Sequence, residues 1–306
     1  MQTLIMDSSQ ISNWFECSQR WANRGLIAIN KKEPELTLQP GEAMAAGSLG
    51  HKYLEIYYQI LAETGNSELA ARSAFAFDPD KADKVEKQFP LDQKLRDLVR
   101  TRFSNYLTYY SAKGDYIPAT RFVPHIITKN GVLADSTRKE ALVEKGFSYK
   151  LYESSEYLFI LEGRIDFLGK AQDGTYFWMD HKWQFKEHEL YAKSIQFRNY
   201  SLATGLYMAV INYVRLHKEI KTNTFVRQPL SFSAYELKCW KQELIEIYVQ
   251  IAKQVREQDF PKNRAACGHG WGGGCQFIPL CDERNASIRA TIQKRDFMSA
   301  KEWRPW

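Results

Sequence analysis

Two carboxylates and a lysine stand close together in a part of the sequence typical of β-strands. Asp180 and Lys182 are separated by one residue, and residues two apart on a strand project from the same face. Asp166 precedes them, at the end of the segment Glu162–Gly163–Arg164–Ile165–Asp166. Two converging carboxylates attract a hard divalent cation such as Mg²⁺, which prefers oxygen ligands. A lysine beside that cation can stabilise charge on a phosphoryl group or position an attacking water.

These residues can be interpreted as a reactive site or as ordinary surface charges, and the neighbouring residues distinguish the two interpretations. A lone Asp-x-Lys triplet is common by chance in a protein of this size. Here Trp178 and Met179 precede the charged residues and Trp183 follows them, so the strand is apolar. A charged pair in an apolar strand is costly unless it has a function. The sequence therefore favours a metal-dependent hydrolytic site.

The elements that must position these residues follow from the hydrophobic pattern. Apolar residues at helical spacing predict helices in the first third, one after Gly47 and one over 91–111. β-Branched and aromatic stretches predict consecutive strands over 141–152, 157–169 and 175–183, and a further strand over 225–233. We predict a helix over 186–216, broken near Gly205, and another over 236–258. This order indicates an α/β fold with a central mixed β-sheet flanked by helices.

Composition and charge narrow the class of protein. With 44% hydrophobic and 25% charged residues, the 306-residue chain has the composition of a soluble globular protein. The net charge of +6 is compatible with a polyanionic partner. The apolar run 201–214 is too short to span a bilayer, and we interpret it as a buried helix. The first ten residues do not resemble a secretory signal, so we expect a cytoplasmic protein without a membrane partner.

The motifs together resemble the RecB-like nucleases of the PD-(D/E)XK superfamily. Gly163–Arg164–Ile165–Asp166, followed by Asp180–His181–Lys182, is similar to two motifs of that family. Gly47–Ser48–Leu49–Gly50–His51 is similar to its upstream histidine motif, and the pair Gln196 and Tyr200 to its Gln-x-x-x-Tyr motif. Taken singly, His51 would be interpreted as a core or surface histidine, and the glutamine–tyrosine pair as helix packing. The four motifs follow one another in the same order as in that family, which favours the interpretation as a nuclease.

The resemblance implies a single nuclease domain over 1–306 with a restriction-endonuclease-like core. Residues 1–130 form its mainly helical part, 140–220 its catalytic core and 260–285 a cysteine-rich region. It implies Mg²⁺ or Mn²⁺ bound by His51, Asp166, Asp180 and the backbone carbonyl of His181. The catalytic residues implied are Asp166, Asp180, Lys182, Gln196 and Tyr200. Glu55 and Glu144 are expected just behind the metal ligands, although Glu144 can equally be a surface charge.

Four of the five cysteines suggest a second metal site. Cys17 lies near the N-terminus, and Cys267, Cys275 and Cys281 are clustered near the C-terminus. This distribution resembles the nuclease domain of AddB and the CRISPR-associated four-cysteine exonucleases, whose cysteines hold a [4Fe–4S] cluster. Those families place two residues between their first two C-terminal cysteines, whereas seven stand here. Zinc bound by four cysteines, or by three and His269, therefore stays open. We expect Cys239 in the core.

The function implied is hydrolysis of DNA. The resemblance predicts a metal-dependent exonuclease that acts on single-stranded ends, leaves 5′-phosphates and serves in repair, recombination or phage DNA processing. No Walker-type phosphate loop is present, so a helicase or recombination partner would be another chain. The alternative is a catalytically silent DNA-binding or scaffold subunit. That alternative predicts the loss of Asp166, Asp180 or Lys182, and all three are present.

Overall fold

The computed structural model describes most of the chain, in two compact units. The described residues are 1–26, 29–31, 42–77, 92–112, 114–119, 126–127, 141–171, 173–185, 194–217, 219–221, 224–268 and 275–299. One unit, here the terminal unit, consists of 1–39, 150–162 and 241–304. The other, here the sheet unit, consists of 40–149, 163–240 and 305–306. The predicted carboxylates and His51 belong to the sheet unit, and the four clustered cysteines to the terminal unit.

The sheet unit is built on a mixed β-sheet. Its strands follow the order β4-β5-β6-β7-β8-β9, and β3 also pairs with β6. β6 and β7 are antiparallel, β7 and β8 parallel, and β8 and β9 antiparallel. The α/β fold with a mixed sheet is thus confirmed, with more strands than the four predicted. The strands are β3 (Ile117–Pro118), β4 (Ile126–Ile127), β5 (Val143–Glu153), β6 (Tyr157–Lys170), β7 (Tyr176–Gln184), β8 (Met208–Arg215) and β9 (Phe225–Ser231).

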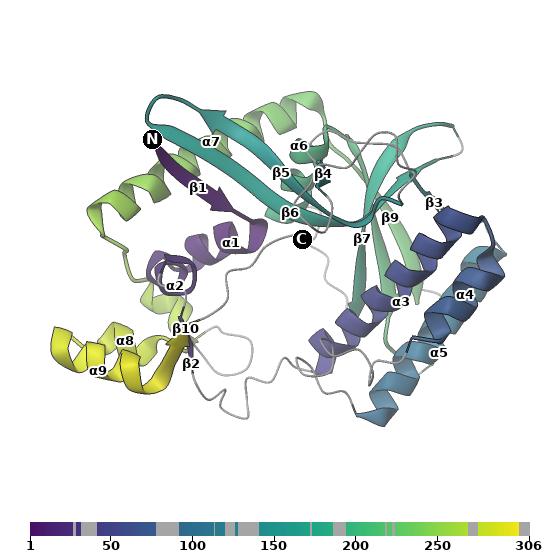
Figure 1. Cartoon of the computed structure of the whole chain (residues 1–306), viewed down its shortest axis with the longest axis horizontal. Coiled ribbons are helices and arrows are strands. Elements are labelled where there is room, and N and C mark those ends of the chain that lie inside the picture. The colour runs from purple at the N-terminus through teal and green to yellow at the C-terminus, as the bar shows by residue number, and fades with distance from the viewer. Residues whose placement is uncertain are drawn as a thin grey trace. The chain divides into compact units, whose positions relative to one another are not determined.

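Three helices pack together on one face of this sheet. They are α3 (Glu42–Thr64), α4 (Ser67–Phe75) and α5 (Gln93–Ser111), which lie side by side in Figure 1. Their core side chains, such as Leu54 and Phe103, pack against Met179, Trp183 and Val214 of the strands. Met179 and Trp183 are two positions either side of His181, so the His181 side chain faces the same helices. The helix α4 was not predicted.

The opposite face carries Trp178, Asp180 and Lys182, which alternate with those residues along β7. The helix α6 (Ile195–Thr204) covers it, with Phe197 and Tyr200 against the Trp178 ring. α6 connects β7 to the parallel strand β8, as a parallel pair requires a crossover.

The helix predicted over 186–216 is wrong beyond residue 204. Gly205 takes a left-handed conformation with φ of 68° and ends α6, and residues 208–215 form β8. Residues 186–193 lie outside the described part of the chain. From Ala209 on, β8 is buried on both faces, so its mostly apolar sequence shows no alternation. Such a run is indistinguishable from a buried helix by periodicity alone.

The terminal unit joins the beginning of the chain to its end. β1 (Gln2–Met6), which was not predicted, pairs in parallel with residues 157–161 of β6. The long helix α7 (Ala234–Glu257) runs beside them, and the Tyr248 hydroxyl donates to the carbonyl of Ile160 at 2.9 Å. The remaining elements are α1 (Ser8–Glu16), α2 (Ser18–Trp21), the π-helix η1 (Ala22–Leu26), β2 (Ile29–Lys31), the 3₁₀ helix η4 (Arg264–Gly268), α8 (Ile278–Asp282), α9 (Ala286–Asp296) and β10 (Phe297–Ser299).

Among the described helices, none is both long and apolar enough to cross a membrane. The loop residues 269–274, including His269, and the basic tail from residue 300 lie outside the described part of the chain.

Candidate functional site

The strands β6 and β7 stop pairing at the two predicted carboxylates. Their antiparallel ladder runs from Lys170↔Tyr176 to Phe167↔Met179. The next two residues in that register are Asp166 and Asp180. Both aspartates are buried, with 8% and 1% of their surface exposed. The carboxylates therefore stand where the sheet opens between two strands that both continue.

The backbone of His181 faces this opening. Its N–H donates to the Asp166 carboxylate, with 2.8 Å between N and Oδ2. In a β-strand the N–H and C=O of one residue point toward the same neighbouring strand. The carbonyl of His181 is consequently directed to the side on which Asp166 lies. This direction is the one that the predicted carbonyl ligand requires.

His51 and Glu144 complete a group of ligand atoms around Asp166. His51 Nδ1 lies 3.5 Å from Asp166 Oδ2 and 3.6 Å from Glu144 Oε1. One atom from each of the three side chains lies within 4.8 Å of the other two. A nitrogen and two carboxylates at these distances form a donor set suited to a divalent cation. Glu144, predicted just behind the ligands, stands here beside His51 and Asp166.

The backbone at Glu144 is strained. Its φ of 51° lies in the left-handed region, although Glu144 lies within a strand. A non-glycine residue there costs on the order of 1–3 kcal/mol, and such residues cluster at functional sites. The other oxygen of Glu144 accepts from Arg164 Nε at 2.9 Å. Arg164 belongs to the quoted motif but was given no role in the sequence analysis.

Two glycines allow the elements to approach each other here. A Cβ atom on Gly50 would lie 2.2 Å from the Trp183 ring, and one on Gly163 would lie 2.4 Å from the Phe147 ring. Real Cβ atoms essentially never come this close to another atom. Gly50 therefore lets α3 lie directly on β7, and that contact places His51 over the carboxylates. Gly47, three residues earlier, has no such contact, because its Cβ would meet only the Trp183 carbonyl at 3.8 Å.

On the α6 face, Asp180 joins Lys182, Gln196 and Tyr200 in one chain of contacts. Lys182 Nζ lies 2.7 Å from Asp180 Oδ2. Gln196 Nε2 donates to Asp180 Oδ1 at 3.1 Å and to the Tyr200 hydroxyl at 2.9 Å, while Gln196 Oε1 lies 3.5 Å from Lys182 Nζ. Ser194 caps α6 by accepting from the Gln196 backbone N–H, which fixes where this helix begins. Four of the five predicted catalytic residues are thus in contact on this face.

The buried carboxylates of the site shift the pKa values of the groups around them. Burial lowers the pKa of His51, but Asp166, Glu144 and Asp180 outweigh that effect and raise it to about 9. Burial raises the pKa of Asp180 to about 6, against the opposing effect of Lys182. Burial also raises the pKa of Asp166, against the effect of His51. Excess carboxylate in a buried site is relieved by a bound cation.

Glu55 lies one turn after His51 on α3. Its carboxylate lies 2.8 Å from Lys52 Nζ, three residues earlier on the same helix.

The four clustered cysteines lie near one another in the terminal unit. Cys17 stands between α1 and α2, and its sulfur accepts from the Asn263 backbone N–H at 3.5 Å. The Cys275 N–H donates to the Cys267 carbonyl at 2.9 Å, and Cys281 lies in α8. Burial raises the pKa of both Cys275 and Cys281, and the other clustered thiols raise it further.

Basic groups face this cysteine cluster. Arg20 acts to lower the pKa of Cys275 and Lys262 that of Cys281. Cys239 lies on the first residues of α7, which belong to the sheet unit, and it is half-buried, not in the core as predicted. It lies against the exposed Tyr235 hydroxyl.

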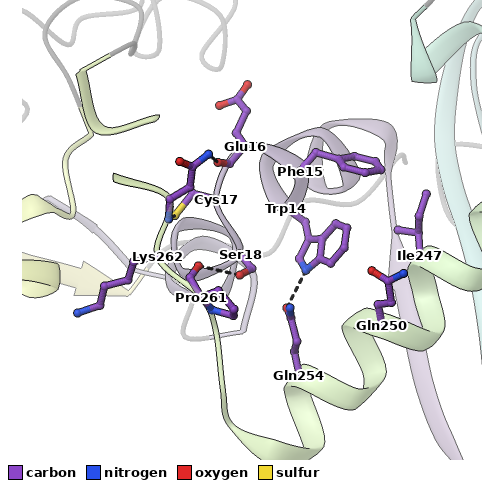
Figure 2. A pocket seen from close by; sticks show the side chains of 11 residues that line it. Trp14, Phe15, Glu16, Cys17, Ser18, Ile247, Gln250, Gln254, Pro261 and Lys262 are labelled. Carbon is purple, nitrogen blue, oxygen red and sulfur yellow. Dashed lines mark hydrogen bonds between the residues drawn. The ribbon is translucent and has the colours of Figure 1, made fainter. Parts of the chain in front are cut away.

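A pocket of about 370 Å³ lies beside Cys17 in the terminal unit (Figure 2). Trp14 and Phe15 line one side, and the Trp14 ring N–H donates to Gln254 at 2.8 Å. Apart from Cys17, its ionisable lining residues are Glu16 and Lys262. A single carboxylate and a single amine do not form a cation-binding or hydrolytic set, so the carboxylate cluster of the sheet unit is the better candidate.

Comparison with known proteins assigns no family. No protein-family model matches the sequence. No curated protein matches it significantly. Among solved structures, the chain is similar to the crystal structure of SSO0001, with 11% sequence identity and a TM-score of 0.30. That match covers 78% of this chain and 84% of the other. At this TM-score the likeness carries no argument, so the functional assignment rests on the site itself.

Proposed function

We propose that the protein is a metal-dependent deoxyribonuclease whose active site is the carboxylate cluster of the sheet unit. One observation carries the proposal. His51, Glu144 and Asp166 offer ligand atoms within 4.8 Å of one another, beside an Asp180–Lys182 pair at 2.7 Å. Metal ligands next to a half-buried lysine are the groups that phosphodiester hydrolysis uses.

The donor set fits Mg²⁺ or Mn²⁺. The His51 ring nitrogen and carboxylate oxygens of Glu144 and Asp166 would hold it, together with Asp180 and the His181 carbonyl that the resemblance adds. Oxygen-rich sets with one imidazole suit Mg²⁺ and Mn²⁺ better than soft metals. When bound, the cation would offset negative charge on the phosphoryl oxygens and favour hydrolysis by water. The carboxylates that raise the pKa of His51 against the effect of burial indicate the negative potential that would attract it.

The remaining residues would act on the substrate from the α6 side. Lys182 lies beside Asp180 and would offset charge that develops on the phosphoryl group. Gln196 contacts Asp180, Lys182 and Tyr200, so it would hold the lysine and the aspartate in one geometry. Tyr200 would keep its proton, because burial and the nearby carboxylates raise its pKa well above the ordinary value.

The substrate class comes from the resemblance to RecB-like nucleases. It supports an exonuclease that acts on single-stranded ends, in one nuclease domain over 1–306 with a helical N-terminal part. The net charge of +6 is compatible with a DNA partner. A helicase or recombination protein on another chain would supply such ends.

The cysteine cluster supports a second metal group. Cys17, Cys267, Cys275 and Cys281 would hold a [4Fe–4S] cluster, as in the families whose cysteine distribution this chain resembles, with zinc as the alternative. The basic groups nearby suit the anionic cluster.

The test is cleavage of end-labelled single-stranded and double-stranded DNA with Mg²⁺ or Mn²⁺. The native chain is compared with Lys182→Ala and with the control Lys170→Ala, which changes a lysine at the far end of β6. We expect Lys182→Ala to lower the rate on the order of a hundredfold or more. Lys170→Ala should cleave like the native protein. DNA that is bound and left intact under both metals would contradict the nuclease and favour the scaffold alternative.

A further inference from the structure

We propose that Asn212, oriented by Arg227, is a positioning residue of the metal centre that acts through the His181 side chain. The inference rests on the proposed metal site and deepens it. It starts from the register of three neighbouring strands. His181 on β7 pairs with Asn212 on β8, and Asn212 pairs with Arg227 on β9. The three side chains therefore stand in one row, on the sheet face that α3 and α5 cover.

Arg227 determines which way the Asn212 amide points. An arginine side chain can only donate hydrogen bonds. Arg227 Nε lies 3.4 Å from Asn212 Oδ1, so that atom must be the amide oxygen. The amide nitrogen is then the atom that lies 2.8 Å from His181 Nδ1. Nδ1 accepts this hydrogen bond, and the proton of the neutral ring is on Nε2.

The tyrosines and Asp115 extend this network. The Tyr106 hydroxyl accepts from Asn212 at 3.1 Å and lies 2.8 Å from Arg227 Nη2 and 2.9 Å from the Tyr58 hydroxyl. The Tyr58 hydroxyl donates to Asp115, at 3.1 Å to the nearer oxygen, and lies 3.2 Å from Arg227 Nη2. Arg227 Nη2 thus shares its two hydrogens among Tyr58, Tyr106 and Asp115, while its Nε sets the orientation of the Asn212 amide.

Arg227 is itself immobilised. Its Nη2 lies 2.5 Å from Asp115 Oδ1, and both side chains are 11% exposed. Its guanidinium stacks on the Tyr110 ring at 3.6 Å and lies 4.5 Å from the Tyr116 ring. Planar stacking together with several hydrogen bonds is a property of arginine that lysine does not share. The row of three residues therefore has a rigid outer end.

The inner end of the row is the metal centre. The His181 ring stacks parallel to Tyr58, with an interplanar angle of 3°. The backbone N–H of the same residue donates to Asp166, and its carbonyl points to the same side of the strand. A ring held at Nδ1 and stacked on Tyr58 restrains the His181 Cβ, and through it the backbone that carries this carbonyl. Hydrogen bonds behind metal ligands have this effect in many metal sites, where their loss typically weakens metal binding by about 10–100-fold.

Stability alone does not account for a buried polar network of this size. Replacing buried ion pairs with apolar residues of similar volume is often neutral or stabilising. A satisfied polar network rigidifies its surroundings and specifies one arrangement of its members. The arrangement that this network specifies is the orientation of a predicted metal ligand.

The test measures Mn²⁺ affinity by isothermal titration calorimetry on the full chain. Asn212→Leu removes the donor to His181 at a fully buried position. The matched control is Asn199→Leu, the same change at an equally buried asparagine that accepts from Trp240 at 2.9 Å. We expect about 10–100-fold weaker Mn²⁺ binding in Asn212→Leu and native affinity in Asn199→Leu. Thermal unfolding of both variants separates this effect from a general loss of stability.

A second variant keeps the inference testable if Asn212→Leu fails to fold. His181→Phe preserves the ring stacked on Tyr58 and the backbone carbonyl but removes the acceptor Nδ1. It should weaken Mn²⁺ binding to a similar degree. In the double variant the two effects should not add, because both pass through one contact.

Unchanged Mn²⁺ affinity in Asn212→Leu or His181→Phe, or the absence of Mn²⁺ binding by the native chain, overturns the inference. Cleavage of DNA, measured in parallel, tests the nuclease separately. Weakened Mn²⁺ binding in a chain that never cleaves DNA would support the positioning role and contradict the proposed function. Normal cleavage with unchanged Mn²⁺ affinity in the variants would support the proposed function and contradict the positioning role.

Discussion

Replacing Gly50 with alanine adds one methyl group where α3 lies against β7. The added Cβ would lie 2.2 Å from Trp183 Cδ2 and 2.3 Å from Cε2. The Trp183 side chain is buried, in a core that also contains Leu54 and Met179. Neither the ring nor the helix can give way without disturbing that core. We therefore expect Gly50→Ala to push α3 and β7 apart.

The magnitude follows from two opposing effects. Alanine is more favourable than glycine inside a helix by roughly 1 kcal/mol. Overpacking a well-packed core costs typically about 1–3 kcal/mol. Gly47→Ala, three residues earlier on the same helix, gains the first effect without the second, because its Cβ would have only an ordinary contact at 3.8 Å. The difference between the two variants therefore isolates the steric cost, at about 1–3 kcal/mol.

Differential scanning calorimetry of both variants measures this difference. For domains of this size it corresponds to several degrees in Tm, since about 1 kcal/mol shifts Tm by roughly 2–4 °C. His51 follows Gly50 directly, so Mn²⁺ affinity should also fall in Gly50→Ala and stay native in Gly47→Ala. A Gly50→Ala protein that melts at or above the temperature of Gly47→Ala would refute the close approach of α3 to β7.

Three further predictions concern protons, metals and cysteines. In metal-free protein the folded state raises the pKa of His51 from 6.5 to about 9, so its stabilisation is complete below pH 6.5 and is lost as pH rises through 9. The Tm difference between native protein and His51→Gln should therefore shrink across that interval, and a constant difference would contradict the raised pKa. EDTA should abolish DNA cleavage, Mn²⁺ should restore it, and cleavage that persists in EDTA would argue against a divalent cation. Iron analysis should find about four iron atoms per chain. Most of them should be lost in Cys275→Ser and all retained in Cys239→Ser. Zinc in place of iron would establish the zinc alternative.

The sequence by itself determined the elements whose hydrophobic pattern has a clear period. The strands β5, β6 and β7 were predicted to within two residues of their ends, because aromatic and β-branched residues bounded by turn sequences specify short strands. The helices α3, α5 and α7 were predicted from apolar residues at helical spacing. Asp180 and Lys182 could be placed on one face because the side-chain period of a strand is fixed.

Tertiary structure alone decided the identity of β8. Its residues are buried on both faces, so they carry neither alternation nor helical spacing, and we predicted a helix. Only pairing with β7 and β9 makes that segment a strand. The same pairing brings Asn212 beside His181 and Arg227, and no local sequence signal marks those residues as a set.

Tertiary contacts also decided which side chains meet as candidate metal ligands. Glu144 carries no sign in the sequence of its left-handed backbone or of its distance to His51 and Asp166. Those contacts join α3 to β5 and β6, which come about eighty residues later in the chain. Local sequence fixes where side chains point within one element, through a short repeating geometry. Which elements become neighbours depends on burial over the whole domain, and that decided which predicted residues meet.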